Sequence, residues 1–248
     1  MNYYLVTLPR LMERRTEISI ILPLYNPHEG WKENFHQALA NLDKLLVGVR
    51  YQIVIVNDGS TRSIDEDFLD DLTAKHKEVT YLAYPINKGK GGAVRFGLAG
   101  VESNYYIYSD FDFPFGYQAI RDTYDLLKTN KVGLVIAKRD EHYYRILPFV
   151  RKVLSRSLQI MNYFLTGFKV LDTQAGLKGL NEVAKDIFLT TKTTSFIFEV
   201  EFIRKAIKKG IPYQYLDVRP KVGIQLTNFG MKTIKKEVKS LLKILSRK

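Results

Sequence analysis

The chain has 248 residues, 46% of them hydrophobic, and a formal net charge of +12 at pH 7. A chain of this size can bury a sizeable core, so we expect one main domain. The absence of cysteine excludes disulfide bonds, thiolate catalysis and cysteine-bound zinc. The positive charge indicates an anionic partner, which is a nucleic acid, a phosphorylated substrate or an acidic membrane surface.

The apolar runs of the sequence are too short to span a bilayer. The N-terminal stretch "MNYYLVTLPRLMERR" also lacks the charged-then-apolar order of a signal peptide. We therefore expect a cytoplasmic protein that is soluble or peripheral to a membrane.

The first 140 residues alternate between two patterns. Apolar β-forming runs lie at 18–24, 51–57, 79–85, 104–110 and 132–138, and segments of helical period lie at 31–47, 64–77, 90–101 and 117–129. This alternation predicts an α/β fold with a mostly parallel central sheet and helices on both faces. Ligands of such folds bind outside the carboxyl ends of the strands, where this chain places its polar and glycine-rich motifs.

The pattern loosens after residue 140 into an apolar and basic helical stretch, short segments around "DTQAGLKGL" and a helix near 197–209. Residues 229–248 form a second unit beside a main domain of 1–228. Apolar residues recur there at helical spacing, and seven Lys or Arg against one Glu give it a charge of +6. This basic amphipathic helix is expected to bind an acidic membrane, dock on the core or pair with a second copy of the chain.

The stretch "YYIYSDFDFPFG" places two carboxylates, Asp110 and Asp112, one residue apart at the end of a β-forming run. Side chains two apart on an extended strand face the same way, so both could reach one Mg²⁺ or Mn²⁺ ion. The alternative is a polar turn that caps the next helix. The position at the end of a strand favours the metal.

Two glycine-containing motifs follow the second and third strands. In "VNDGST", Asp58 either forms a turn or accepts hydrogen bonds from a nucleobase or ribose. In "NKGKGGAVRFG", Lys88 and Lys90 accompany glycines that suit either a phosphate cradle or close packing on the sheet. The four histidines show no metal-ligand spacing, and no Ser-His-Asp triad is evident.

Taken together, these motifs resemble the family 2 glycosyltransferases with a GT-A fold, over roughly residues 18–220. The branch they resemble contains dolichyl-phosphate mannose and glucose synthases and bacterial polyprenyl-phosphate sugar synthases. The resemblance implies that Asp110 and Asp112 bind the metal and the donor diphosphate. It also implies a donor pocket formed by Pro23, Tyr25, Asp58, Asn87, Lys88, Gly89, Asp110 and Gln174.

The same resemblance implies further roles after the fifth strand. Arg139 matches the family's arginine after its fifth strand, and Arg151 with Ser155 resembles the Arg and Ser of the following helix. The two arginines are expected to bind phosphates of donor or acceptor, while "DTQAGLKGL" brings in Asp172 and Gln174. Glu201 occupies the family's acidic helix position. The chain departs from the family at Pro27 and Pro114, which replace an acidic and a polar residue.

The implied activity is metal-dependent, inverting transfer of a sugar from a nucleoside-diphosphate sugar to a lipid phosphate at the cytosolic membrane face. One alternative acceptor is a sugar hydroxyl on a growing glycan, which would require a general base such as Asp172, Glu199 or Glu201. A second alternative is a nucleotide-sugar binder without turnover. Nucleic-acid binding ranks last, because the aromatic residues lie in apolar runs rather than among the basic ones.

Overall fold

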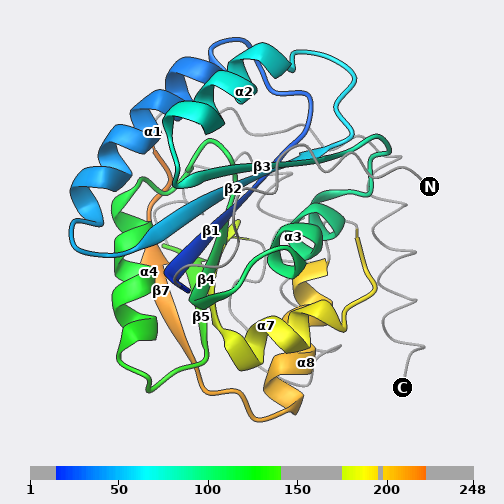
Figure 1. Cartoon of the computed structure of the whole chain (residues 1–248). Helices are drawn as coiled ribbons and strands as arrows, with labels where there is room; N and C mark the ends of the chain where they lie inside the picture. The colour runs from blue at the N-terminus through cyan, green and yellow to red at the C-terminus, as the bar shows by residue number, and fades with distance from the viewer. Residues whose placement is uncertain (1–14, 141–174, 195–197, 222–248) are drawn as a thin grey trace.

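The computed structural model describes residues 15–140, 175–194 and 198–221. Up to residue 140 the elements alternate as the sequence predicts (Figure 1): β1 Thr16–Leu24, α1 Trp31–Leu45, β2 Tyr51–Asp58, α2 Glu66–Lys75, β3 Val79–Tyr84, α3 Lys90–Ala99, β4 Ser103–Ser109, α4 Gln118–Lys128 and β5 Leu134–Arg139. The remaining elements are β6 Leu177–Asn181, α7 Glu182–Leu189, α8 Phe198–Lys208 and β7 Tyr213–Val218.

The seven strands form one sheet in the order β3-β2-β1-β4-β6-β5-β7. All neighbouring pairs are parallel except those of β6, which runs antiparallel to both β4 and β5. From β1 the chain first adds β2 and β3 on one side and then β4 on the other, so β1 and β4 flank a topological switch point, where ligands of open α/β sheets bind. The predicted GT-A fold, with a mostly parallel sheet, is confirmed.

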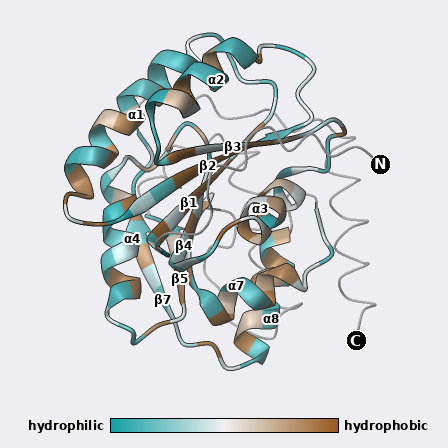
Figure 2. Ribbon diagram, in the orientation of Figure 1, coloured by the Kyte–Doolittle hydropathy of each residue, from teal (hydrophilic) through white to brown (hydrophobic). Residues whose placement is uncertain are grey.

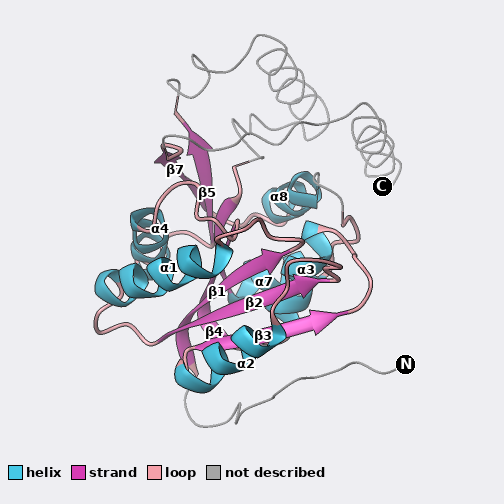
Figure 3. Cartoon of the chain, turned by 90° about the horizontal axis from the view of Figure 1, so that it is seen from above, coloured by secondary structure: helices cyan, strands magenta, loops and turns pink. Residues whose placement is uncertain are grey.

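Helices cover both faces of the sheet, and each face has its own core. Helices α1, α2 and α4 pack with one set of strand side chains, and α3, α7 and α8 pack with the other. Figure 1 shows these two groups on opposite sides of the strands, and Figure 3 gives the same elements seen from above. Neighbouring residues on β1 point to opposite cores, as Ile20 and Ile21 do, because strand side chains alternate. Brown segments, which mark hydrophobic residues, accordingly run along the central strands in Figure 2.

Helix α3 lies close to the sheet because it contains glycine at the contact. A Cβ atom on Gly97 would lie 2.6 Å from Cγ2 of Ile21 and 2.9 Å from Cγ2 of Val56. Any larger residue would push the helix outward. This close contact holds α3 against β1 and β2.

Some predictions fall outside the described residues, namely those on Arg151, Ser155, Asp172, Gln174 and the helix of 229–248. The division into 1–228 and 229–248 therefore stays a prediction. Within the described part of the chain, no helix combines the length and the apolar character needed to cross a membrane.

Candidate active site

Asp110 directly follows β4, and Asp112 lies in the turn after it. The Phe113 amide donates to the Asp110 carbonyl oxygen at 3.0 Å, and Phe113 has a φ of 47°. The pair therefore sits on a tight turn rather than on the extended strand that the sequence suggested. The two carboxylates nevertheless interact: the charge of Asp110, together with desolvation, raises the pKa of Asp112.

Lys90, the first residue of α3, forms an ion pair with Asp110. Its Nζ lies 2.5 Å from Oδ1 of Asp110, and its side chain is 19% exposed. Burial disfavours the charged amine, but Asp110, Glu199 and Asp112 outweigh burial and raise the pKa of Lys90. Lys90 is therefore a fixed positive charge beside the paired carboxylates.

A second ion pair lies behind the first and joins β6 to α8. Nζ of Lys178 lies 2.9 Å from Oε2 of Glu199, and the two side chains are 0% and 3% exposed. Lys178 also donates to the Ala175 carbonyl oxygen. Burial outweighs the attraction of Lys178 and Lys90, so the pKa of Glu199 is raised.

A third lysine approaches from the segment after β7. The Lys221 amide donates to the Pro114 carbonyl oxygen at 2.8 Å, and its Nζ lies 4.4 Å from the centre of the Tyr117 ring. Burial lowers the pKa of Lys221, and the charge of Asp112 opposes this shift. Pro114, which departs from the family pattern, thus contributes its carbonyl group to the turn.

Gly176 supplies the space that the Asp110 carboxylate occupies. A Cβ atom on Gly176 would lie 1.9 Å from Oδ2 of Asp110 and 3.1 Å from Nζ of Lys90. The Gly176 carbonyl oxygen also accepts the Asp110 amide at 3.1 Å. The backbone of residue 176 therefore positions Asp110, and the missing side chain leaves room for its carboxylate.

Asp58 joins the end of β2 to the loop that precedes α3. Its carboxylate accepts hydrogen bonds from the Tyr84 hydroxyl at 2.6 Å, from Nδ2 of Asn87 at 3.0 Å and from the Lys88 amide at 2.7 Å. The residue is only 3% exposed. In this structure Asp58 holds the Asn87–Lys88 loop, and its predicted contact with a nucleobase stays a prediction.

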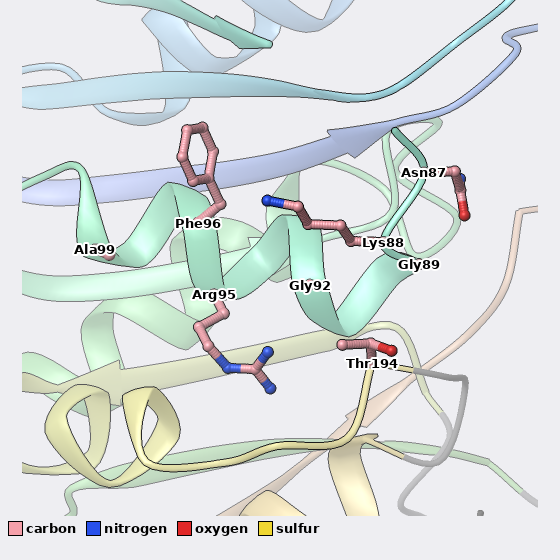
Figure 4. A pocket seen from close by; sticks show the side chains of 8 residues that line it. All are labelled: Asn87, Lys88, Gly89, Gly92, Arg95, Phe96, Ala99 and Thr194. Carbon is pink, nitrogen blue, oxygen red and sulfur yellow. The ribbon is translucent and has the colours of Figure 1, made fainter. Parts of the chain in front are cut away.

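A cavity of about 590 Å³ lies beside this loop (Figure 4). Its lining comprises Asn87, Lys88, Gly89, Gly92, Arg95, Phe96, Ala99 and Thr194. Arg95 is held there by the Thr191 hydroxyl at 2.8 Å and the Thr193 carbonyl oxygen at 2.9 Å. Asp110 does not line this cavity, whose walls come from α3, the loop before it and Thr194. We therefore place the chemistry at the strand ends, not in the cavity.

Glu201 is engaged by backbone amides. The Thr193 amide donates to it at 2.7 Å and the Lys192 amide at 3.1 Å, and Lys205 pairs with it at 3.1 Å. Desolvation opposes the charge, but these hydrogen bonds lower the pKa of Glu201. Its observable role is to fix the segment that contacts α3, where the Thr194 carbonyl oxygen accepts the Gly91 amide at 3.1 Å.

The remaining predicted residues lie along the carboxyl edge of the sheet. Pro23 is half-buried in β1, and Tyr25 follows that strand with 51% of its surface exposed. Arg139 ends β5, which β6 separates from β4. Their predicted roles in binding donor or phosphate remain predictions.

Sequence reasoning missed Gly176, Lys178 and Lys221, and it assigned Lys90 to a phosphate cradle without its carboxylate partner. A charged residue inside the run "LKGLN" was the available signal for Lys178, because a lysine buried in a strand needs an anionic partner.

The carboxylates of Asp110 and Asp112 suit a divalent cation whose coordination shell is completed by other ligands. Among the described residues, no group of three or more His, Cys, Asp or Glu side chains forms a metal cluster. Mg²⁺ commonly binds through one or two carboxylates together with substrate phosphates and water. Asp110 and Asp112 fit that arrangement, since the Asp110 side chain remains 39% exposed.

Comparison with known proteins gives consistent matches. The family model described as "Glycosyl transferase family 2" matches residues 19–188. A dolichyl-phosphate beta-glucosyltransferase from Saccharomyces cerevisiae is 27% identical over 235 residues, covering 85% of this chain and 70% of the relative. The protein of that name from Drosophila melanogaster is 26% identical over 230 residues, covering 86% and 70%.

A solved structure shares the fold. Glucosyl-3-phosphoglycerate synthase from Mycobacterium tuberculosis, in complex with Mn²⁺, UDP and phosphoglyceric acid, matches with a TM-score of 0.66. The sequence identity is 14%, and the match covers 93% of this chain and 77% of that one.

Proposed function

Because this chain is an enzyme of glycosyltransferase family 2, we propose that it transfers a sugar from a nucleoside-diphosphate sugar to the phosphate of a polyprenyl- or dolichyl-type lipid. The names of the relatives from yeast and fly support this acceptor. The proposed reaction is inverting and requires Mg²⁺ or Mn²⁺. A structural relative of low identity holds Mn²⁺ and UDP, which agrees with such a requirement.

The partners of Glu199 and Glu201 on α8 are the observation that decides between the two acceptors. A sugar hydroxyl needs a positioned base to take its proton, whereas a lipid phosphate is already ionised near neutral pH. Glu199 is buried in its ion pair with Lys178, and Glu201 is occupied by the amides of Lys192 and Thr193. Neither carboxylate is available as a base, which favours the phosphate acceptor. Asp172, the third candidate base, lies outside the described residues.

The proposed mechanism assigns electrostatic roles to the residues at the strand ends. A divalent cation held by Asp110 and Asp112 would stabilise the negative charge on the departing diphosphate. Lys90, at the N-terminus of α3, pairs with Asp110, and the Asn87–Gly89 loop that precedes it suits the donor's phosphates. We assign Arg139 and Arg151 to the phosphates of donor or acceptor, and Pro23, Tyr25, Asp58 and Gln174 to the rest of the donor.

We place the reaction at the cytosolic face of a membrane, because a polyprenyl chain stays in the bilayer while the sugar nucleotide is dissolved in water. The basic segment 229–248, with its charge of +6, suits an acidic lipid surface. Sedimentation with acidic liposomes, before and after deletion of 229–248, measures its contribution.

The direct experiment supplies labelled UDP- and GDP-sugars, Mn²⁺ or Mg²⁺ and a polyprenyl phosphate, and then extracts the lipid. We expect metal-dependent label in the organic phase and its loss in Asp112→Ala. Asp71→Ala, which removes an exposed carboxylate of α2 that pairs with Lys75, should transfer at the normal rate. Label that stays in aqueous glycan would move the assignment to a hydroxyl acceptor, and nucleotide binding without any transfer would contradict both.

A further inference from the structure

Lys90 contacts a predicted metal ligand, which gives it a role beyond that of a surface lysine near phosphates. Its Nζ is 2.5 Å from Oδ1 of Asp110, and that carboxylate lies against the backbone of Gly176. The attraction of Glu199 from α8 adds to that of Asp110 and keeps Lys90 charged. A fixed positive charge thus lies where a divalent cation would approach.

Within the described part of the chain, acidic and basic side chains are equal in number around Asp110. Three carboxylates, on Asp110, Asp112 and Glu199, lie with three lysines, Lys90, Lys178 and Lys221. A divalent cation that entered alone would add an excess of positive charge in a partly buried cluster, where such charges interact strongly. A nucleoside diphosphate that enters with it would restore the balance.

We propose that Lys90 couples metal binding to donor binding, by weakening the site for the metal alone and favouring the metal together with a nucleoside diphosphate. This inference rests on the proposed metal and donor site but not on the proposed acceptor. By linkage, the factor by which the nucleotide strengthens metal binding equals the factor by which the metal strengthens nucleotide binding. Lys90 is in this sense a positioning and coupling residue, not one that takes part in bond making.

The test is a titration of the full chain with Mn²⁺, in which free Mn²⁺ is read from its paramagnetic resonance signal. The titration is run without nucleotide and with saturating UDP or GDP, in wild type and in Lys90→Met. We expect the wild type to bind Mn²⁺ weakly alone and at least ~10-fold more tightly with one nucleotide. In Lys90→Met, Mn²⁺ alone should bind ~5-fold or more tightly than in wild type, and the nucleotide effect should shrink.

Two further variants make the result specific. Lys90→Arg keeps the charge and should keep the coupling. Lys75→Met removes an exposed lysine that pairs with Asp71 on α2, and it should behave as wild type. If Lys90→Met fails to fold by thermal melting, Lys90→Gln takes its place.

The proposal is overturned if neither nucleotide strengthens Mn²⁺ binding in wild type. It is also overturned if the loss of the Lys90 charge leaves Mn²⁺ affinity unchanged or weakens it, since Lys90 would then only orient Asp110. None of these measurements uses an acceptor. A failure to transfer sugar to lipid phosphate would therefore refute the proposed function and leave this coupling standing.

Discussion

Substitution of Gly176 by alanine tests the geometry of the Asp110 carboxylate with a single methyl group. The new Cβ atom would lie 1.9 Å from Oδ2 of Asp110 and 2.7 Å from its Cγ. Real Cβ contacts essentially never fall below 3.0 Å, so Oδ2 must move by at least about 1 Å. The Asp110 backbone cannot follow freely, because its amide is bonded to the Gly176 carbonyl oxygen. The carboxylate must therefore rotate away, and the ion pair with Lys90 is disturbed with it.

A displacement of about 1 Å at a catalytic group can cost about 100-fold in rate, and we expect a loss of this size in metal-dependent sugar transfer. Stability should fall by no more than about 1.5 kcal/mol, because the Asp110 side chain is partly exposed and moves into solvent. Sugar transfer is assayed at saturating donor and metal. Unfolding in urea is followed through the fluorescence of the single tryptophan, Trp31, which is buried in the core.

Gly179→Ala is the matched control, three residues further along and inside β6. Its Cβ atom would lie 2.4 Å from Cγ2 of Thr123 and 2.9 Å from Cδ1 of Leu127, both on α4. Overpacking of this kind costs about 1–3 kcal/mol, so Gly179→Ala should lose stability while its folded molecules keep their activity. Wild-type transfer by Gly176→Ala, or a loss that only follows its unfolded fraction, would refute the proposed role of Asp110.

Two further predictions concern the glutamates of α8. Glu201→Gln should destabilise the protein by about 1–3 kcal/mol at pH 7, because a hydrogen-bonded carboxylate is replaced by one neutral oxygen acceptor. The folded-state pKa of Glu201 is lowered, so its contribution is present above the ordinary value of 4.5 and is lost as the pH falls through the folded-state value. Urea unfolding of both proteins between pH 7 and pH 3 checks this, and a constant difference across the range would contradict it. Lys178→Met should lower the free energy of unfolding by about 3–5 kcal/mol, because it leaves Glu199 unpaired. The double variant Lys178→Met with Glu199→Leu should recover part of that stability. A double variant less stable than the single one would refute the pairing argument.

The sequence was informative about the strands and helices that follow a regular alternation. All five expected strands before residue 140 form, with their ends shifted by no more than two residues, because each is a run rich in apolar residues that are buried along most of β2 and in part along the edge strand β3. Strand β6 and helix α7 were not predicted. The run "LKGLN" contains glycine, asparagine and a charged lysine, and only its partners in the fold make it a strand: the neighbours β4 and β5 and the ion pair with Glu199.

The candidate site, too, could be predicted where a local pattern determines it and not where partners in the fold do. The motif placed Asp110 and Asp112 at the end of a strand, and they do follow β4, while their role as metal ligands stays a prediction. The pairing of Lys90 with Asp110 depends on which face of α3 meets the sheet, and this is set by the contact of Gly97 with Ile21 and Val56. No local pattern in the sequence encodes that contact.

The antiparallel strand β6 lies between β4 and β5, and its residues explain why the Lys90–Asp110 and Lys178–Glu199 ion pairs lie on the same side of the sheet. Alternate residues of a strand share a face, so Gly176 and Lys178 point to the side of the sheet that α3 and α8 cover, while Leu177 joins the opposite core. On that side Gly176 meets Asp110 and Lys90, and Lys178 meets Glu199. A shift of one residue in the register of β6 would place Leu177 and Gly179, or Ala175 and Leu177, where Gly176 and Lys178 now lie, and both contacts would be lost. The register of β6 against β4, in which Ser109 lies opposite Leu177, is therefore a condition for the charge balance of the site.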